Sequence, residues 1–111
     1  MDNLITISKM ILHIEKIQEY IKNMDYESFV KDEMVVEACA FNFSQIGELS
    51  HRLEEEYQNQ NPAIPWKAIY GMRNRIIHDY DGINLKVIWE TITEDLPVLC
   101  SQLKKLNPAS R

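Results

Sequence analysis

The chain is poor in the residues that make tight turns, with 3 glycines and 4 prolines among 111 residues. A fold of many short strands would need more of both, so helices are favoured. No apolar run approaches the ~18 residues of a membrane span. Lys9, His13 and Glu15 interrupt the beginning of the sequence, which therefore lacks the pattern of a signal or transit peptide. We expect a helical protein of the cytoplasm.

Cysteine is also scarce. Cys39 and Cys100 show no C-x-x-C spacing and no nearby histidine, so we expect two core thiols in a reducing compartment. The three histidines, His13, His51 and His78, fall on different predicted helices without H-x-x-x-H spacing. This excludes the usual zinc patterns. We expect neither a metal nor a cofactor, and we expect His13 and His51 at the surface.

An excess of positive charge is missing as well, since the formal net charge is -5. Proteins that coat nucleic acid without specificity usually have the opposite balance. Any phosphate contact must therefore be local. Residues 63–80 carry Lys67, Arg73 and Arg75 against Asp79, a formal charge of +2, which permits a confined phosphate site.

Apolar spacing predicts four helical segments, at residues 3–22, 32–57, 66–80 and 85–106. A short extra helical turn at 25–29 and a loop at 57–65 are expected between them. The residues expected to begin, end or bend helices are Asp25, Pro65, Asp81, Gly82, Asn84 and Pro97. The prediction is an all-α four-helix bundle, with residues 1–111 as one domain and its core at about 3–106.

The second predicted helix is apolar on two sides. One side carries Val35, Ala38, Cys39, Ile46, Leu49 and Leu53, and the other carries Val36, Ala40, Phe43 and Gly47. A helix that is apolar on two sides is covered on two sides. Glycine inside a helix costs about 1 kcal/mol relative to alanine, and close approach of a backbone or ligand is the usual compensation. The second side is therefore a candidate for close packing or for a homodimer interface.

The third predicted helix places Arg73 in the middle of an apolar stripe formed by Trp66, Ile69, Tyr70, Ile77 and Tyr80. A buried guanidinium must be paired or hydrogen-bonded. One interpretation is an internal salt bridge to Glu48 or Asp95. The other is an arginine held in a cleft for an anionic ligand. The residues alone leave both open.

His78 and Tyr80, on the same predicted helix, each have a purely structural interpretation and a functional one. Asn74 and His78 are four residues apart and share a face, whereas Arg73 and His78 lie about 140° apart on an ideal helix. His78 could be favoured simply by the dipole at a helix end, and Tyr80 could simply end the apolar stripe. Alternatively, Arg73 and His78 come together at one site. The long arginine side chain, fraying of the helix near Asp79, or the two-fold axis of a dimer could bring them together.

The string R-N-R-I-I-H-D-Y, from Arg73 to Tyr80, resembles the HEPN superfamily, and its R-x-x-x-x-H-x-Y pattern resembles the HepT-type toxins. Three further pieces match in order, I-G-E at 46–48, I-P-W at 64–66 and D-L-P at 95–97. The resemblance spans nearly the whole chain. It implies a four-helix HEPN fold, usually a homodimer that places two copies of the motif at one cleft.

The resemblance also implies a function and its residues. Such proteins act as metal-independent endoribonuclease toxins, and a partner nucleotidyltransferase antitoxin silences them by adding AMP to the motif tyrosine. Carried over, Arg73 and His78 become the catalytic pair, Asn74 and Glu48 supporting residues, and Tyr80 the modified residue. An imidazole with a pKa near 6.5 suits proton transfer at neutral pH, and a guanidinium suits a phosphate.

The expected substrate is RNA and the expected product is a 2′,3′-cyclic phosphate, formed when the 2′-hydroxyl attacks the neighbouring phosphate. The alternative is a HEPN module without catalysis of its own, which binds a nucleotide or docks a nucleotidyltransferase. Degradation of RNA without metal by the purified protein would separate the two.

Overall fold

The computed structural model describes residues 2–78 and 84–107, and the side chains of Ile77 and His78 are outside the description. Tyr80, the turn expected at Asp81 and Gly82, and the end of the chain also lie outside it. The elements are α1 (Asn3–Tyr20), α2 (Tyr26–Lys31), α3 (Glu33–Arg52), α4 (Glu55–Gln60), α5 (Trp66–His78), α6 (Leu85–Glu90), the π-helical turn η2 (Thr91–Asp95) and α7 (Leu96–Leu106). These residues form no strand, so the all-α prediction is confirmed.

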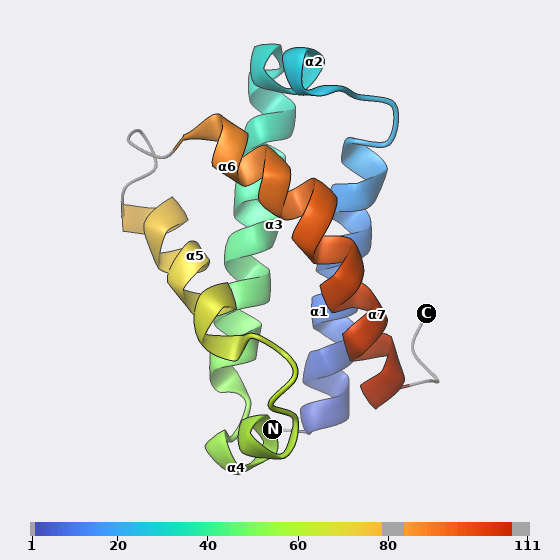
Figure 1. Ribbon diagram of the computed structural model, residues 1–111, viewed down its shortest axis with the longest axis vertical. Coiled ribbons are helices and arrows are strands. Elements are labelled where there is room, and N and C mark those ends of the chain that lie inside the picture. The colour runs from blue at the N-terminus through green and yellow to red at the C-terminus, as the bar shows by residue number, and fades with distance from the viewer. Residues whose placement is uncertain (1, 79–83, 108–111) are drawn as a thin grey trace.

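Four long helical units make the bundle. Figure 1 shows α1 and α3 side by side, with α5 along the other side of α3. The segments α6, η2 and α7 form one continuous helical segment that crosses in front of α3 and α1. The short helices α2 and α4 lie at opposite ends of the molecule. The helix α5 packs mainly on α3, so the residues on the α3 side of α5 decide how this region is built.

Short polar side chains fix where the helices begin. The Asp25 carboxylate accepts from the Ser28 N–H at 2.9 Å while the Ser28 hydroxyl accepts from the Asp25 N–H, which is a capping box. The Asn84 side chain accepts from the Lys86 N–H at 2.7 Å. Both caps were predicted from the sequence. Hydrogen bonding to Ser28 lowers the pKa of Asp25 below its ordinary value.

The core is mostly aliphatic, and α1 contributes more of its fully buried side chains than any other helix, among them Ile7, Met10, Ile11, Ile14 and Ile17. Leu4, near the beginning of α1, is exposed instead. Cys39 and Cys100 are buried free thiols, as expected. Burial raises the pKa of Cys39 to about 12 and also raises the pKa of Cys100. Neither thiol is a nucleophile near neutral pH.

The second predicted helix is shorter than the sequence suggested. The helix α3 ends at Arg52, because Leu53 is extended (ψ 143°) and its side chain is buried. A separate helix, α4, then occupies part of the segment expected to be a loop. The Gln58 side chain donates to the Ser50 carbonyl at 2.8 Å, which satisfies one of the last carbonyls of α3. Residues 54–56 are glutamates, which favour a helix, so the sequence pattern did not reveal the break at Leu53.

The last predicted helix loses α-helical geometry just before Pro97, where a kink was expected. Pro97 has no N–H to give to the carbonyl four residues earlier. The chain widens into the π turn η2, in which the Leu96 N–H bonds to the Thr91 carbonyl. The hydroxyls of Thr91 and Thr93 donate to the carbonyls one turn earlier, at 2.8 and 2.7 Å. Among the residues described, no helix is both long and apolar enough to cross a membrane.

Candidate functional site

The candidate site begins where α3 and α5 come closest, at Gly47. A Cβ built on Gly47 would overlap the Cβ of Arg73 and lie 2.7 Å from its Cγ. The carbonyl oxygen of Ile69 would be 3.4 Å away. Only a residue without a side chain lets the two backbones approach this closely. Gly47 therefore fixes the position from which the Arg73 side chain extends.

The side of α3 that was predicted to serve close packing or a homodimer is used inside the chain. Val36, Ala40, Phe43 and Gly47 are all buried in the single chain. Gly47 lies against α5, as described above. The burial of these side chains within the single chain favours the close-packing interpretation of this face. A homodimer, which stays a prediction, would then need exposed residues elsewhere.

The Arg73 guanidinium lies between the core and solvent. Its Nη2 is 2.6 Å from Oε1 of Glu48, and its Nη1 donates to Oδ1 of Asn74 at 2.8 Å. The Arg73 side chain is 20% exposed and that of Glu48 is 36% exposed. Of the two acids considered from sequence, Glu48 is the partner. The salt-bridge interpretation of Arg73 is therefore observed, and because the side chain keeps some exposure, binding of an anionic ligand stays a prediction.

One nitrogen of this guanidinium has no hydrogen-bond partner among the described residues. The Nε of Arg73 is buried and makes no hydrogen bond within the described part of the chain. A guanidinium carries five N–H donors, and Glu48 and Asn74 occupy two of them. The group is thus held in place, and because Nε is buried, any contact with an anion would have to use N–H groups of Nη1 and Nη2.

The buried side of α5 includes Trp66 and Ile69, as predicted, and also Ile76, which the prediction did not place on the stripe. Tyr70 is half-buried, and the side chain of Ile77 lies outside the described residues. Arg73 belongs to the same side of the helix, and its side chain keeps 20% of its surface exposed.

A histidine that the sequence analysis set aside belongs to the same region. The rings of His51 and Tyr70 stack, with centroids 4.0 Å apart and an interplanar angle of 10°. The Arg73 Cζ lies 5.5 Å from the centroid of the Tyr70 ring. His51 is exposed as predicted, but it is not isolated. The signal in the sequence was its position four residues after Gly47, on the side of α3 that faces α5.

The other predicted site residues are placed as follows. Asn74 lies beside Arg73, and His78 is the last residue of α5, one helical turn after Asn74. The His78 side chain and the whole of Tyr80 lie outside the described residues. His13 is partly buried rather than at the surface, since its Nδ1 is 2.8 Å from Oδ1 of the buried Asn42. That pairing joins α1 to α3 and removes His13 from the candidates.

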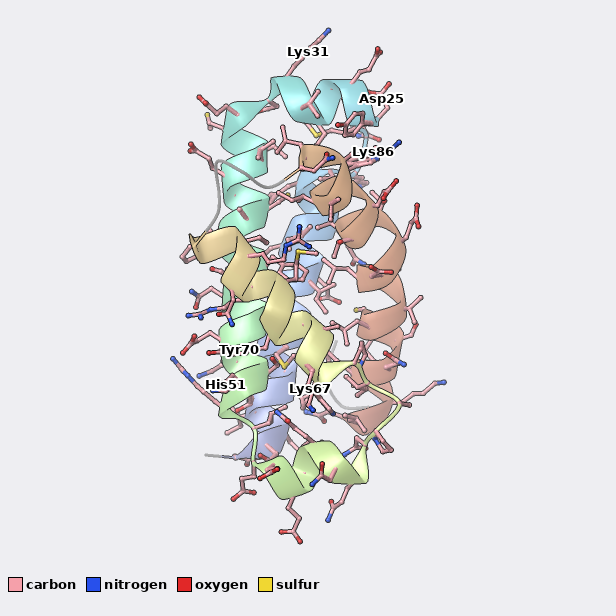
Figure 2. All side chains as sticks on the ribbon, turned by 60° about the vertical axis from the view of Figure 1, so that its left-hand side comes forward. Asp25, Lys31, His51, Lys67, Tyr70 and Lys86 are labelled. Atoms are coloured by element: carbon pink, nitrogen blue, oxygen red, sulfur yellow. The ribbon has the colours of Figure 1, made fainter. Side chains whose placement is uncertain are left out.

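Two cavities lie beside α5. The larger, about 460 Å³, lies on the side of η2 and α7 and is lined mostly by apolar side chains, with Asp95 as the one charged residue that lines it. An acidic group without a cation does not suit a phosphodiester, so we do not assign the site there. The smaller, about 230 Å³, is lined by Ser50, His51, Gln58, Trp66, Lys67 and Tyr70. In Figure 2, His51, Tyr70 and Lys67 lie together where α3 meets the first turns of α5.

Within residues 2–78 and 84–107, His, Cys, Asp and Glu side chains form no group of three or more that could hold a metal ion. The described chemical groups of the region are the Arg73 guanidinium, the His51 imidazole, the Tyr70 phenol ring and the Lys67 ammonium group. These are groups that bind phosphate and stack on bases.

Comparison with known proteins identifies the family. The sequence model of the family described as Ribonuclease HepT-like matches residues 10–106. A protein of Caldanaerobacter subterraneus subsp. tengcongensis that is named as an RNase is 35% identical over 100 residues, covering 90% of this chain and 89% of its own. A protein of Thermococcus cleftensis that is named as a ribonuclease HepT is 33% identical over 93 residues, covering 84% of each chain.

No solved structure matches the chain. The family match nevertheless covers α5 completely, including Arg73, Asn74 and the backbone of His78, and it also covers Gly47 and Glu48 on α3. The all-helical fold agrees with it. This chain therefore belongs to the HepT-like ribonuclease family of the HEPN superfamily.

Proposed function

We propose that this chain is a metal-independent endoribonuclease, the toxin of a type VII-like toxin–antitoxin system, acting in the cytoplasm. The observation that carries the proposal is Arg73, whose guanidinium is anchored by Glu48 and Asn74 while its side chain is 20% exposed. Its helix carries two further cations, Lys67 and Arg75, and no acid from residue 66 to 78. The family match and the RNase names of the relatives support RNA as the substrate.

The proposed reaction needs only groups of the protein and the RNA. The 2′-hydroxyl loses a proton to an imidazole and its oxygen attacks the adjacent phosphorus. The P–O5′ bond breaks, the 5′-oxygen takes up a proton, and a 2′,3′-cyclic phosphate remains. His78 is the proposed proton carrier, and Arg73 stabilises the charge that builds up on the phosphate oxygens. Asn74 and Glu48 orient the guanidinium for this task.

Replacing His78 by alanine tests this function. Loss of a positioned acid or base lowers a rate by about 100- to 10,000-fold. We therefore expect wild-type protein to cleave single-stranded RNA in EDTA, giving 2′,3′-cyclic ends, and His78→Ala protein to lose this activity by that factor. Full activity of the variant contradicts the mechanism. RNA that is bound but left uncut by the wild type would favour the alternative, a HEPN module that only binds a nucleotide or a nucleotidyltransferase.

A homodimer is part of the proposal, and α3 offers a surface for it. Phe41 is 60% exposed and Met34 is 81% exposed. Phe41 and Glu48 are seven residues apart, so they share one side of α3. Leu12, on the neighbouring helix α1, is exposed too, and it precedes His13, which is bonded to α3. Two copies that join through Phe41 would bring their Arg73 residues toward a common cleft.

This surface predicts the outcome of one substitution. Phe41→Glu would place a charge in the apolar contact, so we expect the protein to sediment as a monomer while the wild type sediments as a dimer. Val98→Glu is the matched control, because Val98 is also 59% exposed but lies on α7. Equal sedimentation of the wild type and Phe41→Glu would exclude this interface.

Silencing by AMP at Tyr80 is the last part of the proposal. AMP on the phenol would put a phosphate near Arg73 and compete with the substrate phosphate. After co-expression with the cognate minimal nucleotidyltransferase, we expect a mass increase of one AMP on the peptide that contains Tyr80, and none on Tyr80→Phe protein. An inactive complex with unmodified Tyr80 would refute this mode of silencing.

A further inference from the structure

We infer that the cavity of about 230 Å³ between the end of α3, α4 and the beginning of α5 is a nucleotide subsite. It would hold the base of a nucleotide close to the phosphate gripped by Arg73, with Lys67 on the backbone. The ligand class is single-stranded RNA. The choice of RNA as the ligand rests on the proposed function. The inference adds where on the protein a nucleotide binds and which side chains bind it.

Stacking geometry is the first argument. The imidazole of His51 lies flat on the Tyr70 ring, 4.0 Å centroid to centroid, and His51 is exposed. Among the described residues, Tyr70 is its one aromatic partner, so no second ring stacks on the other face of this exposed imidazole. A flat ring that is backed by a second ring and faces solvent is the kind of platform on which unpaired bases stack.

Connection to the reactive group is the second argument. Tyr70 contacts His51 on one helix and, through a cation–π contact of 5.5 Å, Arg73 on its own helix. The platform and the guanidinium are thus joined through a single ring. Stacked nucleotides rise ~3.4 Å each along a strand. A base on His51 therefore belongs to a nucleotide adjoining the phosphate at Arg73, or the next one along.

Polar groups in the cavity complete the subsite. Gln58 uses its Nε2 on the Ser50 carbonyl, which fixes the amide, while its oxygen accepts no hydrogen bond from the described residues. Lys67 makes no ion pair with any described residue. Trp66, in contrast, has its indole N–H committed to the carbonyls of Gln58 and Asn61 and acts as a wall. The side-chain oxygen of Gln58 is therefore available to accept a hydrogen bond from a base edge, and the Lys67 ammonium group is available to bind a phosphate.

The size of the cavity decides what fits. Sites for drug-sized ligands measure roughly 300–1,000 Å³. A cavity of about 230 Å³ is too small for a dinucleotide but suits one base with part of its ribose. The larger cavity beside η2 has the volume but lacks a lining cation among its residues. The binding of RNA is therefore assigned to the smaller one.

The test is RNA binding in the His78→Ala background, which retains Arg73 and the subsite while removing the proposed proton carrier. A short fluorescent single-stranded RNA is titrated and anisotropy gives Kd. Loss of one base–aromatic stack weakens binding about 10- to 100-fold, so we expect that change for His51→Ala. His51→Phe keeps the ring and should bind like its parent.

Two lysines make a matched pair of controls. Lys67→Ala should weaken binding and reduce the salt dependence by about one phosphate contact, a slope change of roughly 0.7 for a single strand. Lys86→Ala makes the same charge change at the opposite end of the molecule and should bind like the parent (Figure 2). Equal Kd values for His51→Ala and Lys86→Ala would overturn the subsite.

An RNA with an abasic position identifies the nucleotide. Moving the abasic site along the strand should reveal one position at which His51→Ala no longer weakens binding, because the stacked base is already missing. A His51→Ala penalty that persists for every abasic position overturns the stacking role.

The two proposals fail separately. Cleavage by the wild type with an unchanged Kd for His51→Ala removes the subsite alone. A His51-dependent Kd in a protein that never cleaves RNA removes the nuclease alone. If the protein neither binds nor cleaves RNA, both proposals are wrong.

Discussion

Arg73→Ala should lower metal-free RNA cleavage by about 1,000-fold or more while leaving the fold intact. Removing one preorganised donor from a transition state costs about 100- to 1,000-fold, and removing an arginine that neutralises phosphoryl charge costs about 1,000- to 100,000-fold. The structural loss is small by comparison. The Arg73–Glu48 pair is partly exposed, and pairs of this kind contribute about 0–1 kcal/mol to stability.

The measurement is the initial rate of cleavage together with the thermal midpoint of unfolding of each variant. Arg75→Ala is the matched control, because Arg75 is an exposed arginine two residues away on the same helix. It should keep a rate near that of the wild type. Arg73→Lys keeps the charge but loses the fork that reaches Glu48 and Asn74, so we expect it to remain strongly impaired. An active Arg73→Ala protein would reduce this residue to a surface ion pair.

Gly47→Ala should destabilise the protein, although alanine is the better helix former. Alanine gains about 1 kcal/mol in helix propensity. Its Cβ, however, would overlap Arg73 Cβ and lie 2.7 Å from Cγ. The Arg73 Cβ is tied to its backbone, so relief requires α3 and α5 to separate, and overpacking of this kind costs about 1–3 kcal/mol. We expect the clash to win, with the thermal midpoint lowered by roughly 5 °C.

Gly71→Ala is the control with the opposite sign. Gly71 is exposed in α5, and a Cβ there would meet no atom within 4 Å among the described residues. It should raise stability by about 0.5–1 kcal/mol, and the thermal midpoint with it. Gly47→Ala should also lower the cleavage rate, since displacing a catalytic group by ~1 Å can cost about 100-fold. A midpoint raised equally by both substitutions would mean that α3 and α5 do not meet at Gly47.

Local chemistry explains what the sequence predicted correctly. Helix starts at Asp25 and Asn84 depend on a side chain and an N–H two or three residues away, so they can be read along the chain. Burial of Cys39 and Cys100 follows from residue type and helical periodicity. The break after Arg52 could not be seen in the same way, because it depends on Leu53 entering the core while Gln58 reaches back to Ser50.

The candidate site also has features that the sequence predicts and features that only the tertiary structure determines. The sequence by itself determined an all-helical chain and the motif residues Arg73, Asn74 and His78 on one helix, because periodicity and spacing are local properties. The tertiary structure alone decided that Glu48 rather than Asp95 holds Arg73, that Gly47 admits α5 of its own chain, and that His51 stacks on Tyr70. These pairings join α3 to α5, and the packing and rotation of two helices fix them rather than any spacing within one.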